Sequence, residues 1–412
     1  MYEALLIVLT VLFTAIAVRD LRWGVCVATA ALPTYLLRFT IGGVPFTFLE
    51  VMIWVLTAVV VWRERKHFKR FAQTLPLSSR WRIAILFLIL AATAAILPAP
   101  SITPALGVWK AYFIEPILLF FIVLFVAREQ PDREMIVRAL GAGALFVALT
   151  TILQTTTSIG IPAPWDVEGR ATGIFPYPNA VGLYLGPIMV LGAFAWSRAK
   201  VFWTTTLATS AVAIVLAQSE AALVAVPVTL FLASLTSARV RRLSIPLALV
   251  ALTIILATPA IRTPVIQKLT LQDYSGGVRI AQWQDTVRFL QDHPLQGAGL
   301  SGYPMAIAPY HSHPEHEIFQ YPHNIVFNVW VELGVLGLLA VGFLSFTALS
   351  SYTFPATSNA IAPLFALIEM VIHGLVDVPY FKNDLAALTW MILALLVLYA
   401  TYDRRQTVSP RG

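Results

Sequence analysis

Apolar segments long enough to cross a membrane follow one another along almost the whole chain. Of its 412 residues, 58% are hydrophobic and only 12% are charged, against about 25% charged residues in soluble globular domains. A stretch of about 20 apolar residues spans the hydrocarbon core as a helix, because a helix pairs its own backbone N–H and C=O groups. The sequence therefore predicts an all-α integral membrane protein, and this composition excludes a soluble domain.

We predict about 12 to 13 transmembrane helices. The number is approximate because the first three segments are short or interrupted by Pro33 and Pro45. The first segment has the small residues of a signal-peptide site, but no basic residues precede it and more spans follow, so we expect a transmembrane helix. The predicted spans are 3–18, 24–38, 46–62, 82–98, 109–127, 139–157, 178–196, 201–217, 221–236, 243–258, 324–346, 358–377 and 385–401.

Basic residues lie mainly on one side of these spans. With the amino terminus outside, only eight of the 28 Lys and Arg residues fall in outward segments, which leaves 20 on the cytoplasmic side. The positive-inside rule accounts for this asymmetry, so the net charge of +7 does not require a nucleic-acid partner. The eight outward cations, which that rule does not explain, are Arg38, Lys110, Arg170, Arg262, Lys268, Arg279, Arg288 and Lys382.

Two outward segments are long enough to build a site, residues 158–177 and the loop 259–322, and long ordered loops tend to carry function. Within the loop, 278–293 predicts an amphipathic helix on the membrane surface, with Phe289 at the interface. Arg279 in its first turn opposes the helix dipole, which suggests that it reaches for an anion. The apolar residues of the predicted helix at spacings of three and four are Ile280, Trp283, Val287 and Leu290.

Three motifs on the predicted outward side resemble those of the O-antigen ligase and polymerase superfamily. The first is RATGIFPYPNA at 170–180, and the second is VRIAQWQDTVRFLQDHPLQGAGLSGY at 278–303. In the third, nine residues separate the pair His323-Asn324 from Gly334, and two more separate Gly334 from Gly337. The resemblance covers roughly residues 165–400. We therefore divide the chain into N-terminal transmembrane helices, residues 1–157, and a catalytic membrane region, residues 158–412.

The resemblance implies a metal-independent membrane glycosyltransferase that needs no cofactor. It also implies transfer of a glycan from a polyprenyl pyrophosphate carrier on the outer face of the cytoplasmic (inner) membrane of a prokaryote. The expected partners are this donor, a glycan, lipid or protein acceptor, and membrane lipids, with no nucleic acid. Polymerisation, ligation and protein glycosylation are alternatives that the sequence does not separate.

Arg170 and Arg279 are the expected catalytic cations, because arginine binds phosphate oxygens through paired N–H groups. Lipid headgroups are the alternative ligands, since interfacial arginines extend towards them. Asn179 and Trp283 belong to the same motifs and are expected at the substrate. Arg288, nine residues after Arg279, points elsewhere around a helix of about 3.6 residues per turn, which makes it a secondary contact.

His323 precedes the predicted helix 324–346, where the positive end of the helix dipole disfavours the imidazolium. A neutral imidazole can accept a proton from an acceptor hydroxyl or orient that hydroxyl; the alternative is an interfacial histidine that caps the helix. Asn324 and Asn328 lie one turn apart and can hydrogen-bond the sugar or a neighbouring helix. Gly334 and Gly337 are expected to let another helix approach closely.

Carboxylates inside the predicted spans are expected to be paired within the bundle, but Glu332 lies on the motif helix and is a candidate substrate contact. His373 and Asp377, four residues apart, are expected to hydrogen-bond each other. One position departs from the superfamily pattern. Ser219-Glu220-Ala221 stands where members often carry Ser-Arg-Gly, so Glu220 could instead serve an acceptor or pair with an outward arginine.

The segment HSHPEHE at 311–317 has three histidines and two glutamates, which by composition alone is a plausible zinc site. Pro314 and the loop context favour a solvated loop instead. The superfamily reaction requires no tightly held metal, so no metal site is expected. The single cysteine, Cys26, excludes a disulfide within the chain.

A transporter or flippase of lipid-linked glycans is the alternative from another class of protein. It predicts charged residues along a central pathway and symmetry between the two halves. The sequence shows no internal repeat, and its motifs gather at outward helix ends. A metal transporter built on the histidine loop would also want ligands within the spans, for which His373 is thin support. The sequence therefore favours the enzyme.

Overall fold

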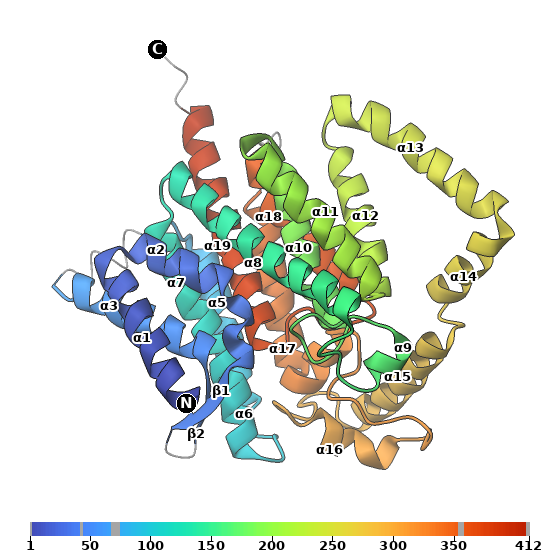
Figure 1. The fold of residues 1–412 in the computed structure, drawn as a ribbon. Coiled ribbons are helices and arrows are strands. Elements are labelled where there is room, and N and C mark those ends of the chain that lie inside the picture. The colour runs from blue at the N-terminus through green and yellow to red at the C-terminus, as the bar shows by residue number, and fades with distance from the viewer. Residues whose placement is uncertain (1, 42–43, 67–74, 353–357, 409–412) are drawn as a thin grey trace.

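The computed structural model describes residues 2–41, 44–66, 75–352 and 358–408, and most of these residues are helical (Figure 1). Seven of the described helices are long and apolar enough to cross a membrane, and three shorter apolar helices accompany them. The prediction of a multi-pass membrane protein is confirmed. The seven are Tyr2–Arg19, Ile102–Val126, Gln130–Thr157, Asn179–Arg198, Ala238–Ala257, Ile325–Ser350 and Asn383–Tyr402; the shorter three are Lys200–Leu216, Glu220–Ser234 and Ala360–His373.

Each predicted span except 24–38 falls on a helix. There, α2 ends at Ala30 and a 3-10 turn, Leu32–Leu36, follows with Pro33 in its first turn, because proline cannot donate the backbone hydrogen bond that would continue the helix. The α-helices are α1 (Tyr2–Arg19), α2 (Leu21–Ala30), α3 (Phe48–Glu64), α5 (Ser79–Ala94), α6 (Ile102–Trp109), α7 (Glu115–Val126), α8 (Gln130–Thr157), α9 (Trp165–Glu168), α10 (Asn179–Ala195), α11 (Lys200–Leu216), α12 (Glu220–Ser234), α13 (Ala238–Ala257), α14 (Pro259–Leu269), α15 (Tyr274–Asp292), α16 (Tyr303–Ile307), α17 (Ile325–Ser350), α18 (Ser358–His373) and α19 (Asn383–Val408).

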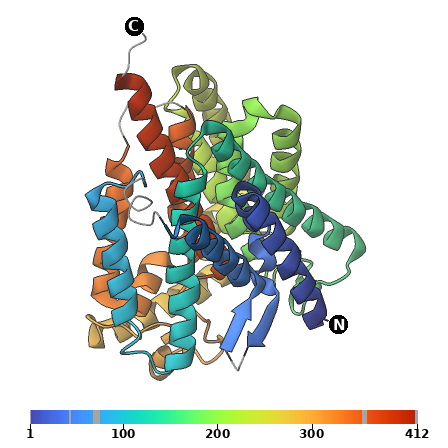
Figure 2. The same ribbon diagram turned by 90° about the vertical axis from the view of Figure 1, so that its left-hand side faces the viewer.

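A β-hairpin that the sequence did not predict precedes α3. Its strands, β1 (Arg38–Ile41) and β2 (Val44–Thr47), pair antiparallel with Arg38 opposite Thr47. Figure 2 shows the hairpin at the same end of the molecule as the start of α1. The side chain of Thr47 then begins α3 in a reciprocal capping box with Glu50, which satisfies two backbone N–H groups that a helix start leaves free.

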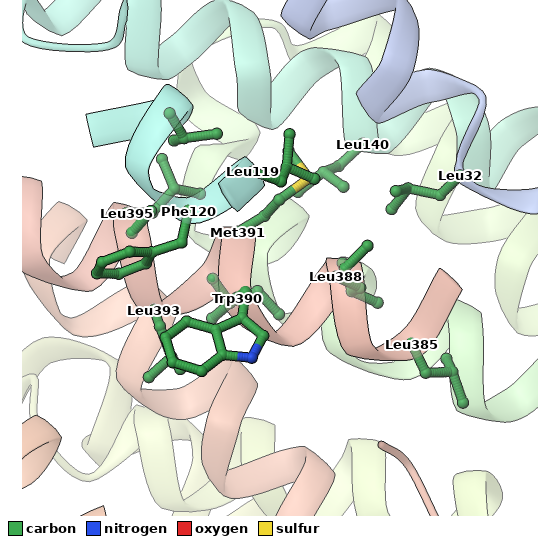
Figure 3. Packing of buried hydrophobic residues seen from close by; sticks show 14 of the residues in the cluster. Leu32, Leu119, Phe120, Leu140, Leu385, Leu388, Trp390, Met391, Leu393 and Leu395 are labelled. Carbon is green, nitrogen blue, oxygen red and sulfur yellow. The ribbon is translucent and has the colours of Figure 1, made fainter. Parts of the chain in front are cut away.

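The core of the bundle is built around α19, which packs against α7 and α18. Trp390 lies edge to face on Phe120 with the ring centroids 5.2 Å apart, and both side chains are fully buried (Figure 3). The indole Nε1 of Trp390 donates to the hydroxyl of Tyr380 at 3.0 Å. Since lipid is as apolar as leucine, such close packing and satisfied polar groups hold the helices together. The core therefore fixes the segment that connects α18 to α19.

Helix α15 meets the rest of the chain through a face that only partly overlaps the predicted one. Phe289, expected at the membrane interface, is buried with Leu290 of the predicted face in a small cluster that includes Tyr303 of α16 and Val331 of α17. Ile280, also of the predicted face, is 37% exposed. Because the loop after α15 folds back onto the helix, the buried face is shifted around the helix towards Phe289.

Helix α17 is kinked at Gly334, whose φ of 65° and ψ of −166° are not helical. The loop after α15 enters this kink: Val335 donates its N–H to the carbonyl of Leu295 at 3.0 Å, and Ala298 donates to that of Val331 at 2.7 Å. A Cβ on Gly334 would lie 2.3 Å from the Leu295 carbonyl oxygen. At Gly334 the expectation of a neighbouring helix was therefore wrong, because what approaches is loop backbone.

We expect Gly334→Ala to lower the thermal unfolding temperature of the purified protein clearly, with a cost of about 3 kcal/mol or more, because only glycine tolerates this backbone conformation. Differential scanning fluorimetry in detergent measures it. Gly342→Ala, on the same helix with open space around its Cβ, is the matched control and should not destabilise the protein. Equal melting temperatures for the two variants would contradict the role of the kink.

Candidate functional site

The segment 374–378, which follows α18 and is called here the 374–378 turn, accepts hydrogen bonds from two other segments that the sequence predicted to be outward. The backbone N–H of Ile325, at the start of α17, donates to the Gly374 carbonyl at 2.7 Å. The Nε of Arg279, on α15, donates to the Val376 carbonyl at 3.1 Å. Since both carbonyls belong to one short segment, the turn places α15 against the mouth of α17.

A continuous chain of hydrogen bonds joins His323 to Arg170 through this turn. His323 Nδ1 lies 3.4 Å from Asp377 Oδ1. The Nδ2 of Asn179 donates to Asp377 Oδ2 at 3.2 Å, and Arg170 Nη2 donates to Asn179 Oδ1 at 3.2 Å. Of the three predicted catalytic residues, His323 thus contacts the Asp377 carboxylate directly and Arg170 is linked to it through Asn179, whereas Arg279 bonds the neighbouring Val376 carbonyl. The sequence had not assigned Asp377 to this site.

Asp377 is buried, at 1% exposure, and stays ionised because of its partners. Burial by itself would raise the pKa of Asp377. The hydrogen bond and charge of His323, the charge of His373 and the backbone N–H of Val378 outweigh it and hold this pKa well below its usual range. A buried anion of this kind can fix the orientation of the imidazole.

The structure corrects the expected pairing of His373 with Asp377. His373 Nδ1 lies 3.3 Å from Glu369 Oε1 on the same helix, with both side chains fully buried, whereas Asp377 takes His323 as its hydrogen-bond partner. The reason is that α18 ends at His373. The helical spacing of four residues does not extend to Asp377, so the turn aims that carboxylate elsewhere.

His323 occupies a left-handed backbone position, with φ of 44°, immediately before the helix. Its ring lies between those of Phe319 and Tyr321, with centroids 5.1 and 5.2 Å away. Asn324 is the N-cap of α17: Oδ1 accepts from the N–H groups of the second and third helical residues, and Nδ2 donates to the Leu375 carbonyl at 2.9 Å. The amide therefore holds the backbone on which the imidazole is mounted.

Arg170 is fixed at the base of the segment 158–177. Its guanidinium lies over the Trp165 ring, 5.2 Å from the centroid, and pairs with Glu168 at 3.5 Å. The segment itself is tied to α8 by Gln154, which accepts from the N–H groups of Thr172 and Gly173 at 2.8 Å each. Since the Arg170 side chain is 21% exposed, a positioned cation remains accessible from the surface.

Helix α15 carries Arg279 and Trp283 to the same place. Trp283 Nε1 donates to the Pro322 carbonyl at 2.8 Å, and Gln282 Nε2 donates to the Tyr321 carbonyl at 2.9 Å. These two bonds clamp the residues directly before His323. The side chain of Trp283, which the second motif placed at the substrate, thus positions the segment before His323.

Lys382 is a further cation beside the site, and sequence reasoning left it only as an unexplained outward charge. Its ammonium lies 4.4 Å from the ring centroid of Tyr177, with the Tyr35 and Phe175 rings beyond. Tyr177 in turn shares a hydrogen bond of 2.9 Å with Tyr321. Burial lowers the pKa of Lys382, while the negative charges of Asp384 and Asp377 oppose that shift. The Lys382 amine therefore lies behind the tyrosines, beside the site, with its charged form disfavoured by burial and favoured by the two aspartates.

Other predicted site residues have partners away from the turn. Arg288 bonds to Asp285 and, at 2.7 Å, to the Ser312 hydroxyl. Glu332 accepts the Ser301 N–H at 2.6 Å and so holds the loop that enters the α17 kink.

Asn328 is buried, and neither its oxygen nor its nitrogen has a hydrogen-bond partner among the described residues, which leaves an amide able to bind a polar group.

Glu220, which stands where the superfamily often has arginine, forms an ion pair with Lys268 of α14. Lys110, also predicted to be outward, likewise pairs with Glu50 at 2.7 Å, within the bundle. These pairs give two of the eight predicted outward cations a structural partner. Three of the remaining ones, Arg170, Arg279 and Lys382, lie near the 374–378 turn.

Residues 205–342 match the family model described as O-antigen ligase, which is a stretch of 138 residues (342 − 205 + 1) out of 412. The match includes Arg279 and His323 but neither Arg170 nor Asp377. No curated protein matches the chain. The resemblance expected from the motifs is confirmed over this stretch, and it indicates a membrane enzyme similar to the O-antigen ligases.

The lowered pKa of Asp377 predicts a pH dependence of stability. Because the native carboxylate binds a proton less readily than the ordinary aspartate, with its pKa of about 3.9, its contribution is complete above that pH and is lost as the pH falls through the native pKa. The melting temperature of wild type should therefore exceed that of Asp377→Asn at pH 6, and the difference should shrink below about pH 4. Parallel curves from pH 3 to 7 would contradict this.

Proposed function

We propose, from this similarity to the O-antigen ligases, that the chain transfers a glycan from a polyprenyl pyrophosphate donor to an acceptor hydroxyl at the outer face of a prokaryotic cytoplasmic membrane. One observation carries the proposal: two arginines and a histidine from three distant segments are linked to the 374–378 turn. His323 and Arg279 bond the turn directly, and Arg170 is linked to it through Asn179. This supports a reaction that needs cations for a leaving group and a base for a nucleophile.

The donor half of the proposed site is cationic. When the bond between the anomeric carbon and the pyrophosphate oxygen breaks, negative charge develops on the lipid pyrophosphate. Arg170 and Arg279 would stabilise that charge, because their guanidinium groups are held in place before the substrate arrives. Arg170 is oriented by Asn179, and Arg279 by the Val376 carbonyl and the Ser275 hydroxyl. Lys382 would add a longer-range positive field.

The acceptor half is His323. If Nδ1–H is directed at Asp377, the lone pair of Nε2 is free to take the proton of the acceptor hydroxyl. The hydroxyl oxygen then forms the new bond to the anomeric carbon, the old carbon–oxygen bond breaks, and the lipid pyrophosphate leaves. Asp377 would stabilise the imidazolium while it holds the proton. No metal enters this scheme.

The remaining predicted contacts have supporting places in the proposal. The unpartnered amide of Asn328 would bind a sugar hydroxyl, and Trp283 would offer its ring to the glycan while its Nε1 holds Pro322. Arg288 and Glu332 would act through the loops that they hold, near residues 312 and 301. Asn179 would act by bridging Arg170 and Asp377 through its side-chain amide.

A transporter of lipid-linked glycans is less well supported by these positions. The carboxylates inside the bundle that a transport pathway would use are in part engaged: Glu115 accepts from Trp54 at 2.8 Å, and Glu369 lies beside His373. The polar network instead gathers at the ends of α10, α17 and α18. This distribution favours chemistry at one face.

We expect His323→Ala to slow glycan transfer by about 10² to 10⁴-fold, the usual contribution of a general base. Arg279→Ala should also slow transfer strongly, because one fixed cation is lost. Purified protein in detergent is given a lipid pyrophosphate oligosaccharide and candidate acceptors, and the products are separated by length. Arg262→Ala on α14, an exposed arginine outside the network, is the matched control and should transfer at the wild-type rate.

The same separation of products by length distinguishes the acceptor classes. A ladder of lipid-linked products indicates polymerisation, and a single addition to another lipid or to a protein indicates ligation. Wild-type rates in both His323→Ala and Arg279→Ala would show that the proposed residues are wrong. Movement of the lipid-linked glycan across liposomes without any covalent change would instead favour the transporter.

A further inference from the structure

The segment HSHPEHE at 311–317, which the sequence favoured as a solvated loop, contains a closed turn. His316 donates its backbone N–H to the carbonyl of His313 at 2.9 Å, and Pro314 occupies the second position, where its fixed φ suits such a turn. This geometry brings the His313 and His316 rings together, with centroids 5.6 Å apart. Glu315 lies between them in sequence, with Oε1 3.0 Å from His313 Nδ1.

The three side chains of this turn offer a set of metal ligands in one place. A nitrogen of His313, a nitrogen of His316 and a carboxylate oxygen of Glu315 all lie within 4.8 Å of one another. Ligands at about 2.0 to 2.2 Å around a tetrahedral zinc ion are themselves about 3.3 Å apart. Because His313 and Glu315 are 40% and 62% exposed, rotation of these two side chains can close the remaining distance.

A second, independent feature of the turn points to a ligand. The Nδ1 atom of His316 is buried, and no hydrogen-bond partner reaches it within the described part of the chain. A buried polar atom without a partner costs free energy. Next to it lies a small hollow whose lining includes both rings of the turn and the carboxylate of Glu317. The site therefore has space, a nearby carboxylate and an unsatisfied nitrogen.

We propose that His313, Glu315 and His316 bind a borderline transition metal ion of the Zn²⁺ class. Two imidazoles and one carboxylate are a common set of zinc ligands, with a fourth position for water. Mg²⁺ and Ca²⁺ prefer several oxygen ligands, and this turn supplies one carboxylate for two imidazoles. The charge of the ion offsets that of Glu315 and of Glu317 in the lining of the hollow.

The metal would act on the architecture of the outward loop. One end of the segment is already fixed, since Ser312 donates its hydroxyl to Asp285 of α15 at 2.8 Å. The other end runs to Phe319, which lines the same hollow and lies against the His323 ring. An ion bound between these ends restrains the wall beside the proposed site without taking part in transfer. The proposal is independent of the proposed function.

The test is isothermal titration of the full chain with ZnCl₂ in detergent, after chelator treatment and with a non-histidine affinity tag. Wild type should bind one Zn²⁺ per chain and melt at a higher temperature with it, whereas MgCl₂ should give neither effect. His313→Ala/His316→Ala should weaken zinc binding by at least about tenfold, since ligands contribute at least as much as their outer-shell partners.

Two variants locate the bound ion. His293→Ala removes a histidine that stacks on Phe289 at 4.9 Å, and His323→Ala removes the histidine of the proposed active site. Both should bind zinc as wild type does. Failure of wild type to bind zinc would overturn the proposal, and so would wild-type binding by the double variant. If His323→Ala lost zinc binding while His313→Ala/His316→Ala kept it, the ion would bind at the proposed active site. That result would also overturn the zinc proposal.

Discussion

The buried carboxylate of Asp377 is the group on which the arrangement of the proposed site depends. It is approached by the His323 imidazole, the Asn179 amide and the N–H of Val378, at 3.4, 3.2 and 2.8 Å. An anion at 1% exposure requires such partners, because an unpaired buried charge costs several kcal/mol. The same requirement joins the mouths of α10 and α17, so stability and the geometry of the proposed site have one physical origin.

The backbone of the 374–378 turn extends this effect to the segments around the proposed site. The carbonyls of Leu375 and Val376, just beyond the end of α18, accept hydrogen bonds from the side chains of Asn324 and Arg279. Helix ends leave such carbonyls free, and here other segments satisfy them. Within α17, the kink at Gly334 likewise leaves backbone groups free, and the loop that follows α15 hydrogen-bonds to them. Irregular backbone near a membrane is tolerated where protein buries it, and both places are stabilised in this way.

The long helices and the three motifs could be predicted from the sequence because apolar length and residue spacing are local properties. Arg170, Arg279 and His323 were predicted as site residues in that way, and the structure links all three to the 374–378 turn. Asp377 was paired wrongly, since the end of α18 at His373 depends on tertiary contacts rather than on spacing. The hairpin of β1 and β2 was missed because each strand has only four residues, which is too short for an alternating pattern to stand out. The buried face of α15 depends on a loop that folds back, and periodicity cannot show this.

The central claim is that His323 and Asp377 act as one unit. A double-mutant cycle on the rate of glycan transfer tests it most directly, with His323→Ala, Asp377→Asn and the pair measured under the same conditions. Residues that act as a unit are strongly non-additive. The account predicts that Asp377→Asn slows wild type considerably and has little further effect once His323 is alanine. Equal fold-losses in both backgrounds would contradict it, because the carboxylate would then contribute independently of the imidazole.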